Sequence, residues 1–247
     1  MRRWFCSVWR KCPPETQKLL KDFERKIRYR FRNPGLLIQA LKHRSYLAIS
    51  DEARGWANER LEFLGDAVLD LVSSEYFYQK HPDKLEGEMT QMKSILVSGS
   101  VLAKEAQRMD LGKYLLLSDN EARSGGRNRS SILEDAFEAL IGAIYLDGGY
   151  RPVQKFLVRE LLGNSKDIFR DTRLQNYKSM LLEYTQAKGI APPDYIVKEE
   201  IGPEHQKKFV VEVQVGNGIC GTGEGRTKKI AEQMAAQEAA RELDLIT

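Results

Sequence analysis

Apolar residues recur about every 3.6 positions along much of the first two thirds of the chain, which is the period of a helix with a buried face. Turn-forming pairs that begin at Pro34, Pro82, Gly125 and Gly148 interrupt this pattern. Apolar and polar residues do not alternate one by one between these breaks, as they would in a strand. The pattern therefore predicts an all-helical domain over residues 15–162. The predicted helices cover residues 17–29, 58–79, 88–108, 131–146 and 152–162, and the fourth, apolar on most faces, should be central.

A short polar segment, residues 163–171, marks a change of pattern and is predicted to be a linker. Beyond it, apolar spacings of three and four residues around Tyr177 and Leu181 predict one helix. Apolar residues then alternate with polar ones, most clearly over 208–215, which predicts strands. The order helix, three strands, helix over residues 172–247 predicts an α+β domain with both helices on one face of an antiparallel sheet. The strands are expected at 194–199, 208–215 and 218–222, and the last helix at 227–243.

Four acidic residues interrupt the two most informative helices of the first domain. Glu62 and Asp66 lie four residues apart, and Asp135 and Glu138 lie three apart, so each pair occupies one helix face. Like charges at these spacings repel, and the repulsion grows where water is scarce. If the two helices meet, the four carboxylates would form a set of oxygen ligands suited to Mg²⁺ or Mn²⁺.

The alternative for any one of these acids is a solvated side chain, or an acid that stabilises a helix N-terminus. Asp70 and Glu134 have explanations of that kind. Ser131 and Glu134 match the pattern of a capping box, which predicts that the second acidic helix begins there. Because a same-face acid pair recurs in two apolar helices, and core helices rarely carry unpaired carboxylates, the pattern favours a functional site.

Charge is distributed unevenly along the 247 residues, whose formal net charge is +4. Residues 1–32 carry 11 basic and 3 acidic side chains, whereas the rest of the chain carries more acidic than basic ones. Bulk charge therefore does not predict nucleic-acid binding in either folded domain. The basic tail, residues 1–14, lacks the apolar run of a signal peptide, and no run is long enough to span a membrane. The three cysteines form no disulfide or zinc pattern, so we expect a cytoplasmic protein.

Two lysines oppose a local preference in the second domain. Thr227 is a good N-cap residue, so Lys228 and Lys229 fall in the first turn of the last predicted helix. Cations there oppose the helix dipole, at about 0.3–1 kcal/mol each. A helix N-terminus that also carries lysines is suited to bind a phosphate, although a merely solvated lysine pair remains the alternative.

The sequence NERLEFLGDAVL, residues 58–69, resembles the signature of the ribonuclease III family. The segment SGGRNRSSILEDAFEALIGAIYLDGGY, residues 124–150, resembles that family's second catalytic segment, and the resemblance runs over nearly the whole chain. It implies an all-α ribonuclease III endonuclease domain. The residues that it assigns to metal binding and catalysis are Glu62, Asp66, Asp135 and Glu138.

The same resemblance implies further features. Glu59 and Glu86 would be supporting acids near the interface of a homodimer. The enzyme would leave 5′-phosphate and 3′-hydroxyl ends, and its substrates would be ribosomal RNA precursors and structured messenger RNAs. Independently of the resemblance, Arg127 and Arg129, in the loop before the second acidic helix, are predicted either to hold the RNA backbone or to lie in a solvated loop.

Residues 172–244 resemble a double-stranded-RNA-binding domain, through GEGRTKKIAEQMAA at 223–236 and GPEHQKKF at 202–209. Such domains read the shape, phosphates and 2′-hydroxyls of A-form RNA. Leu182 stands where some relatives have Gln, and Glu232 stands where the family often has a third basic residue, and both departures bear on affinity. The residues that the resemblance assigns to RNA contacts are Ser179, Glu183, His205, Lys207, Lys208, Arg226, Lys228 and Lys229.

The carboxylates and the duplex-binding domain together predict a Mg²⁺-dependent endoribonuclease that hydrolyses double-stranded RNA, with Mn²⁺ as a possible substitute ion. A non-catalytic, regulatory protein that binds double-stranded RNA is the main alternative. A metal-dependent hydrolase of small phosphates is a third hypothesis, which the duplex-binding domain disfavours.

Overall fold

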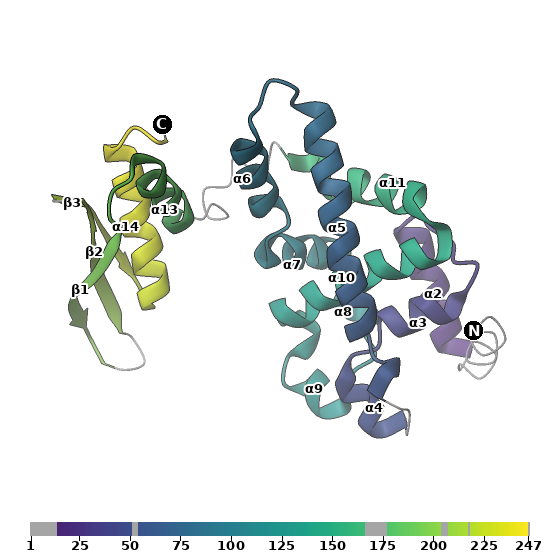
Figure 1. The fold of residues 1–247 in the computed structure, drawn as a ribbon. Helices are drawn as coiled ribbons and strands as arrows, with labels where there is room; N and C mark the ends of the chain where they lie inside the picture. The colour runs from purple at the N-terminus through teal and green to yellow at the C-terminus, as the bar shows by residue number, and fades with distance from the viewer. Residues whose placement is uncertain (1–13, 51–53, 166–176, 204–206, 217, 247) are drawn as a thin grey trace. The chain divides into compact units, whose positions relative to one another are not determined.

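The structure is a computed structural model that describes residues 14–50, 54–165, 177–203, 207–216 and 218–246. The chain divides into two compact units, Met1–Leu174 and Gln175–Thr247, and each is described by itself (Figure 1). Most of the predicted tail 1–14, most of the predicted linker 163–171 and all of His205 lie outside the described residues.

Within its described residues, the first unit is helical. Its elements are α2 (Pro14–Lys26), α3 (Pro34–Ala40), α4 (Arg44–Ser50), η1 (Arg54–Trp56), α5 (Glu59–Lys80), α6 (Glu86–Leu96), α7 (Gly99–Arg108), α8 (Leu111–Tyr114), α9 (Asp119–Arg123), η2 (Gly126–Asn128), α10 (Ser130–Gly148), α11 (Tyr150–Glu160) and η3 (Leu162–Asn164). Among the described residues of the chain, no helix is both long and apolar enough to cross a membrane.

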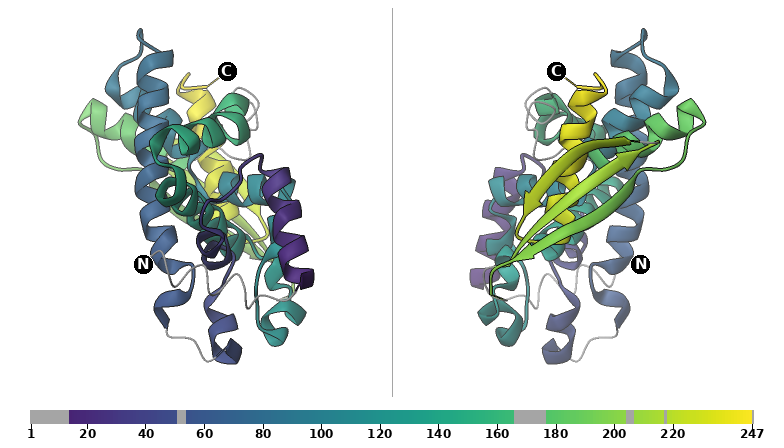
Figure 2. Two further views of the ribbon diagram at one scale, coloured as in Figure 1. Left: turned by 90° about the vertical axis from the view of Figure 1, so that its right-hand side faces the viewer. Right: turned by 90° about the vertical axis from the view of Figure 1, so that its left-hand side faces the viewer.

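Helix α10 lies at the centre of the first unit, as its sequence predicted (Figures 1 and 2). Phe137, Leu140 and Ile141 are fully buried, and buried residues occur on most faces of the helix. It packs against α3, α5, α7 and α11. An apolar surface that extends around a helix can be buried only when neighbours cover it on several sides, so the other helices surround α10.

The predicted helix 88–108 is wrong as one element, because the structure has two helices there. Helix α6 ends at Leu96, and Ser98 has extended dihedral angles before α7 begins at Gly99. The hydroxyl of Ser98 donates to the carbonyl oxygen of Ile95 at 2.7 Å, which satisfies a carbonyl at the end of α6. The apolar period continues through the break because both helices face the same core, so spacing alone did not reveal it.

The second unit contains α13 (Tyr177–Lys188), an antiparallel sheet of β1 (Asp194–Ile201), β2 (Lys208–Val215) and β3 (Gly218–Gly225) in the order β1-β2-β3, and α14 (Lys228–Glu242). Helix α14 packs on β2 and β3, and α13 packs on α14. A Cβ added at Gly221 or Gly223 would overlap the backbone of α14 beside Ala235. Glycine in the strand and alanine in the helix therefore allow close packing.

Candidate active site and nucleic-acid interface

Helices α5 and α10 cross at two glycines. A Cβ added at Gly65 of α5 would overlap the carbonyl oxygen of Glu138, and one added at Gly142 of α10 would overlap the carbonyl oxygen of Leu61. The two backbones are therefore in direct contact at this crossing. Gly65 lies within three residues of Glu62 and Asp66, and Gly142 lies four residues from Glu138 and seven from Asp135, so the crossing brings the two pairs together.

The pKa of Glu138 responds both to burial and to the other acids at the crossing. Its half-buried position and the negative charges of Asp66, Glu134, Glu62 and Asp135 raise that pKa to about 8. Burial is the largest cause, since it removes water that would stabilise the charged form. Near neutral pH, Glu138 therefore lies close to its own titration point, as groups at functional sites often do.

Two more carboxylates of this group have raised pKa values. Burial and then the charge of Asp135 raise the pKa of Glu62. Burial raises the pKa of Asp135, while the neighbouring His43 and Arg44 lower it. The local environment therefore opposes the charged forms, and a cation would relieve this opposition.

The donor set of this acidic cluster, defined as Glu62, Asp66, Asp135 and Glu138, fits a hard divalent cation because every donor is a carboxylate oxygen. Among the residues that the structure describes, no three Asp, Glu, His or Cys side chains converge as closely as the ligands of one bound ion. Mutual repulsion between carboxylates favours such a spread arrangement. The chemistry of the side chains thus fits Mg²⁺ or Mn²⁺, while their final ligand geometry requires a shift of side chains.

The predicted capping box at Ser131 and Glu134 is wrong. Helix α10 begins one residue earlier, with Arg129 at the N-cap position, and no side chain there makes a capping bond. The carboxylate of Glu134 instead packs over Gly99, at the N-terminus of α7. The dipole of α7 favours a negative charge at that place. Burial, and then the charge of Asp135, raises the pKa of Glu134.

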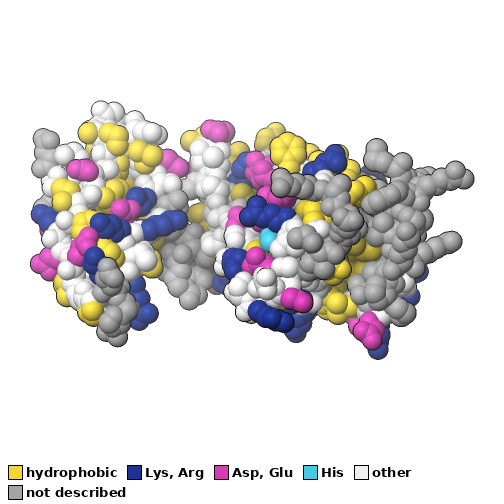
Figure 3. Space-filling view, turned by 90° about the horizontal axis from the view of Figure 1, so that it is seen from below, with side chains coloured by type: hydrophobic (Ala, Val, Ile, Leu, Met, Phe, Trp, Pro, Cys, Tyr) yellow, Lys and Arg dark blue, Asp and Glu magenta, His cyan; other side chains and the backbone are white. Residues whose placement is uncertain are grey.

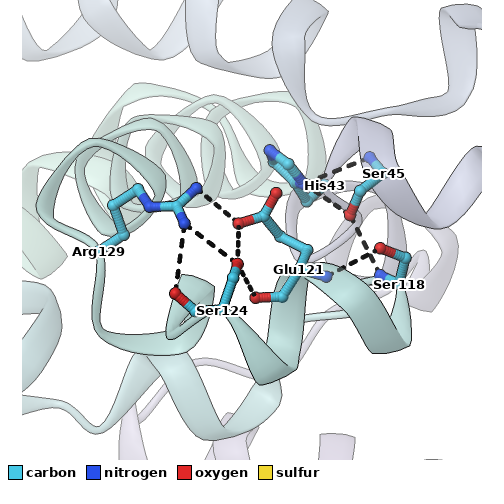
Figure 4. Close-up of polar contacts among 6 residues, drawn as sticks. All are labelled: His43, Ser45, Ser118, Glu121, Ser124 and Arg129. Carbon is cyan, nitrogen blue, oxygen red and sulfur yellow. Dashed lines mark hydrogen bonds and ion pairs between the residues drawn. The ribbon is translucent and has the colours of Figure 1, made fainter.

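A cleft of about 1080 Å³ adjoins the acidic cluster, and Glu62 and Asp135 form part of its lining. His43, Ser45, Glu121 and Arg129 also line this cleft, and Figure 4 shows these four side chains with their polar contacts. In the view of Figure 3, a histidine side chain lies between basic and acidic ones. The cleft therefore offers both cationic and anionic groups beside the carboxylates.

His43 is held at the cleft by its neighbours rather than placed as a free base. The backbone N–H of Ser45 donates to His43 Nδ1 at 3.2 Å, and the Ser45 hydroxyl lies 2.9 Å from the same nitrogen. The N–H of Ser118 donates to that hydroxyl at 3.1 Å. Nδ1 is thus an acceptor, and in the neutral ring the proton resides on Nε2. Burial lowers the pKa of His43.

The two loop arginines have different roles. Arg127 Nη1 donates to the carbonyl oxygens of Gly112 and Leu115, at 2.8 and 2.9 Å, so this side chain fixes the loop to α8. Arg129 lies 2.5 Å from Glu121 at the edge of the cleft. Only Arg129 is therefore placed beside the acidic cluster, and sequence spacing could not distinguish it from Arg127.

The supporting acids Glu59 and Glu86 lie apart from each other and are both exposed. Glu59 lines the cleft, and its carboxylate lies 3.9 Å from the guanidinium of Arg44. Glu86 accepts a hydrogen bond from the Thr90 hydroxyl at 3.1 Å in α6, and it lines a different groove, between α5 and α6. Only Glu59 therefore adjoins the acidic cluster within this chain.

The basic residues of the second unit form two groups. Lys207 and Lys228 both pair with Glu200, at 2.6 and 3.0 Å, and both lie over the ring of Phe209. Lys208 pairs with Glu224 across the strands. The hydroxyl of Thr227 accepts from the N–H of Ile230 at 3.2 Å, which confirms the predicted N-cap. The remaining described candidates, Ser179, Glu183, Arg226 and Lys229, are exposed.

Double-stranded RNA is recognised across its surface by its shape, phosphates and 2′-hydroxyls, which exposed side chains can contact. A cleft of about 740 Å³ lies between α13, β1 and α14, and it includes Ser179 and Lys229. Lys178 lies on its wall, 2.5 Å from Glu232 and 4.4 Å from the centre of the Tyr195 ring. Glu232 therefore neutralises a lysine on this surface, a contact that sequence reasoning missed.

Comparison with known proteins gives matches over both units. The family model described as Ribonuclease-III-like matches residues 33–165, and the model described as double-stranded RNA binding motif matches residues 177–243. The chain is 43% identical to Ribonuclease 3 of Clostridium acetobutylicum over 230 residues, which cover 93% of this chain and 99% of that relative. It is 41% identical to Ribonuclease 3 of Pseudothermotoga lettingae over 233 residues, which cover 93% of this chain and 98% of that relative.

Solved structures are similar to the first unit. The nuclease domain of ribonuclease III from Campylobacter jejuni matches with a TM-score of 0.53 and 40% sequence identity. The match covers 57% of this chain and 95% of that domain. The helical architecture around α5 and α10 is therefore shared with a nuclease domain of known structure.

Proposed function

This chain belongs to the ribonuclease III family, and we propose that its acidic cluster hydrolyses phosphodiester bonds in RNA duplexes that the second unit binds. The match to a double-stranded RNA binding motif and the identity with Ribonuclease 3 over most of the chain support a double-strand-specific endoribonuclease. The observation that carries the catalytic assignment is the glycine crossing of α5 and α10, which brings the two acid pairs close together. Burial and the neighbouring carboxylates raise the pKa of Glu138 to about 8.

The four carboxylates would bind Mg²⁺, or Mn²⁺ in its place, because their donor atoms fit such an ion. When bound, the ion would acidify a water molecule and neutralise charge on the reacting phosphate. Asp66 and Glu138 are the pair that we assign most directly to the chemistry, with Glu62 and Asp135 as further ligands. In the reaction, water attacks phosphorus, the bond to the 3′-oxygen breaks, and that oxygen takes a proton. The products are a 5′-phosphate and a 3′-hydroxyl end.

A homodimer would supply one acidic cluster for each strand of a duplex. Support comes from an exposed apolar stripe on α5. Phe63, Leu71 and Tyr78 are 82, 56 and 73% exposed, and at 100° per residue they fall within about 80° around the helix. Such a stripe is uncommon on a monomer surface. A structure of the Campylobacter jejuni nuclease domain concerns structural flexibility in a region involved in dimer formation.

Replacing Phe63 by alanine is expected to weaken this dimer by at least a hundredfold. Burial of one Phe side chain contributes roughly 1.5–3 kcal/mol, and a two-fold interface would lose it from both subunits. Sedimentation equilibrium over a range of concentrations measures the change. The matched control is Leu19→Ala, which removes an exposed apolar side chain of α2, outside the stripe. A Phe63→Ala variant that dimerises like the wild type would contradict this assignment.

Replacing Glu232 by glutamine is expected to raise the affinity for duplex RNA about three- to tenfold. The change releases Lys178 from its ion pair, and the freed lysine can contact a phosphate. One additional phosphate contact should steepen the salt dependence of binding by about 0.9. Gel-shift titrations at several salt concentrations measure both quantities. Glu242→Gln, which removes the same charge from the end of α14, serves as the control. Equal salt slopes for the two variants would contradict the prediction.

The proposed function is tested with one labelled RNA in duplex and single-stranded form. Wild-type protein should cut the duplex in Mg²⁺ and leave the single strand and EDTA-treated samples intact. End analysis should find 5′-phosphate and 3′-hydroxyl groups, and a gel shift in Ca²⁺ should report binding alone. Binding without cleavage in any divalent ion would favour the non-catalytic, regulatory alternative. As working proposals for the cell, we assign processing of ribosomal RNA precursors and structured messenger RNAs in the cytoplasm.

A further inference from the structure

A basic surface lies where the end of α2 meets the start of α11. We define it by four exposed side chains, Arg28, Arg30, Arg151 and Lys155. Two adjoining grooves, of about 800 and 380 Å³, share Arg28 and the neighbouring tyrosine, and the four side chains line one or both of them. This surface is separate from the acidic cluster and its cleft, whose lining includes none of the four.

Nearby acids do not neutralise this surface. Among the residues that the structure describes, none forms an ion pair or hydrogen bond with the four basic side chains. Glu24, which lines the larger groove, accepts from the backbone N–H of Phe31 at 2.8 Å. Asp147 accepts from the Tyr29 hydroxyl at 2.7 Å and from two backbone N–H groups. These two carboxylates therefore accept hydrogen bonds from the chain itself, and neither pairs directly with one of the four basic side chains.

Two of the four residues oppose a local structural preference. Arg28 follows the end of α2 with a φ of +50°, a conformation that favours glycine. Arg151 is the second residue of α11, where a cation opposes the helix dipole. A surface that served only solubility could carry its charges at positions without such penalties. Local preferences are most often violated at functional sites.

We propose that this basic surface binds the phosphate backbone of the RNA substrate, outside the segment that is cut. The inference rests on the proposed function, which supplies a polyanion as the partner. Residues 1–13 carry four basic and no acidic side chains, so the N-terminal segment has the wrong sign to occupy the surface. An acidic protein partner would also match the positive charge of this surface. Direct measurement of RNA binding distinguishes between the two partners.

The surface is placed to contact backbone rather than bases. The rings of Tyr29 and Phe31 pack edge to face, 4.9 Å apart, and the Tyr29 hydroxyl is bonded to Asp147, so neither ring is free to stack on a base. Phosphate contacts carry no sequence information, and this suits a duplex binder. Asp147 follows Glu138 in α10 by nine positions, or ~14 Å along the helix axis. RNA held at both places must therefore extend beyond the bond that is cut.

The test is a double variant, Arg28→Gly with Arg151→Gln, in the full chain. Removing two phosphate contacts should weaken binding of a long duplex roughly tenfold and lower the salt slope by about 1.8. Binding of a duplex too short to extend from the acidic cluster to this surface should be unchanged. Because both substitutions relieve a local penalty, the melting temperature should rise by ~2 °C or more.

The charge-retaining variant Arg28→Lys with Arg151→Lys is the matched control, and it should keep the wild-type salt slope. A double variant that binds the long duplex like the wild type at every salt concentration would overturn the proposal. A fall in melting temperature would also overturn it, because the two arginines would then serve the fold. If the wild type binds neither duplex, the proposed function itself fails, and this result is distinguishable from both of the others.

Discussion

Replacing Glu138 by glutamine is expected to lower the rate of duplex cleavage by about 10²–10³-fold, a loss typical of removing one preorganised electrostatic group from an active site. Glutamine keeps the size of the side chain and one oxygen donor, but it removes the charge that would hold a divalent ion. Binding of the duplex should remain, because the second unit is unchanged. Single-turnover cleavage in Mg²⁺, with a gel shift in Ca²⁺, separates the two effects.

The same variant should be more stable than the wild type in EDTA at neutral pH. The pKa of Glu138 is raised from 4.5 to about 8 by burial and neighbouring carboxylates, so its ionisation opposes folding. After discounting for partial exposure, the gain from glutamine is about 1–2 kcal/mol. An acid whose pKa is higher in the folded than in the unfolded protein destabilises the folded state increasingly as the pH rises from the unfolded pKa to the folded pKa. The gain should therefore be absent near pH 4, grow up to about pH 8, and stay constant above it.

This stability measurement distinguishes a loss of catalysis from a loss of folding, because a variant that is inactive yet more stable has not misfolded. Glu134→Gln is the matched control. It removes one charge from the same turn of α10, but its carboxylate packs over Gly99, and it should keep most of the activity. Full activity in Glu138→Gln would show that this residue is not a catalytic ligand. Equal losses in both variants would point to a general effect of charge.

Replacing Gly65 by alanine is expected to destabilise the first unit by roughly 3 kcal/mol, and to lower its melting temperature by ~6–12 °C. The new Cβ would overlap the carbonyl oxygen of Glu138, and a backbone atom in a central helix cannot move aside as a side chain can. Alanine is favoured over glycine within a helix by about 1 kcal/mol. The overlap is the larger effect, so the net change should be a loss. Differential scanning calorimetry in EDTA measures it.

Gly87→Ala is the matched control, because Gly87 also lies in a helix but an added Cβ there meets no atom within 4 Å. This variant should be as stable as the wild type or slightly more so. Cleavage by Gly65→Ala should fall even below its melting temperature, since separating α5 from α10 moves Asp66 away from Glu138. Wild-type stability and activity in Gly65→Ala would show that the helices do not rely on this close crossing.

Local signals in the sequence were sufficient to predict several elements. The period of apolar residues predicted the helical first unit and the central position of α10. Thr227 was predicted as the N-cap of α14 from its residue type and position, because its hydroxyl needs to reach an N–H only three residues away. The strands were predicted from alternation, although β1 and β3 extend to Ile201 and Gly225, beyond the predicted ends. These features depend on interactions within a few residues, so sequence spacing encodes them.

Other features depended on partners that are distant in the sequence. The position of Glu134 over Gly99 and the pairing of Lys178 with Glu232 each depend on contacts between residues that are far apart in the sequence. Arg127 and Arg129 are two residues apart and similar in sequence context, yet one fixes α8 and the other lines the cleft.

The sequence by itself determined which acids are candidates for the active site, because two like charges on one face of an apolar helix are unfavourable, and this holds within each helix alone. It also determined the order of elements and the ribonuclease III resemblance. Only the tertiary structure decided that the pairs face each other, since this depends on backbone contact between Gly65 of α5 and Gly142 of α10. It likewise decided which residues form the basic surface, because Arg28 and Arg151 line one groove only when the end of α2 packs near α11. Local sequence sets what each segment can form, and packing between distant segments sets which side chains meet.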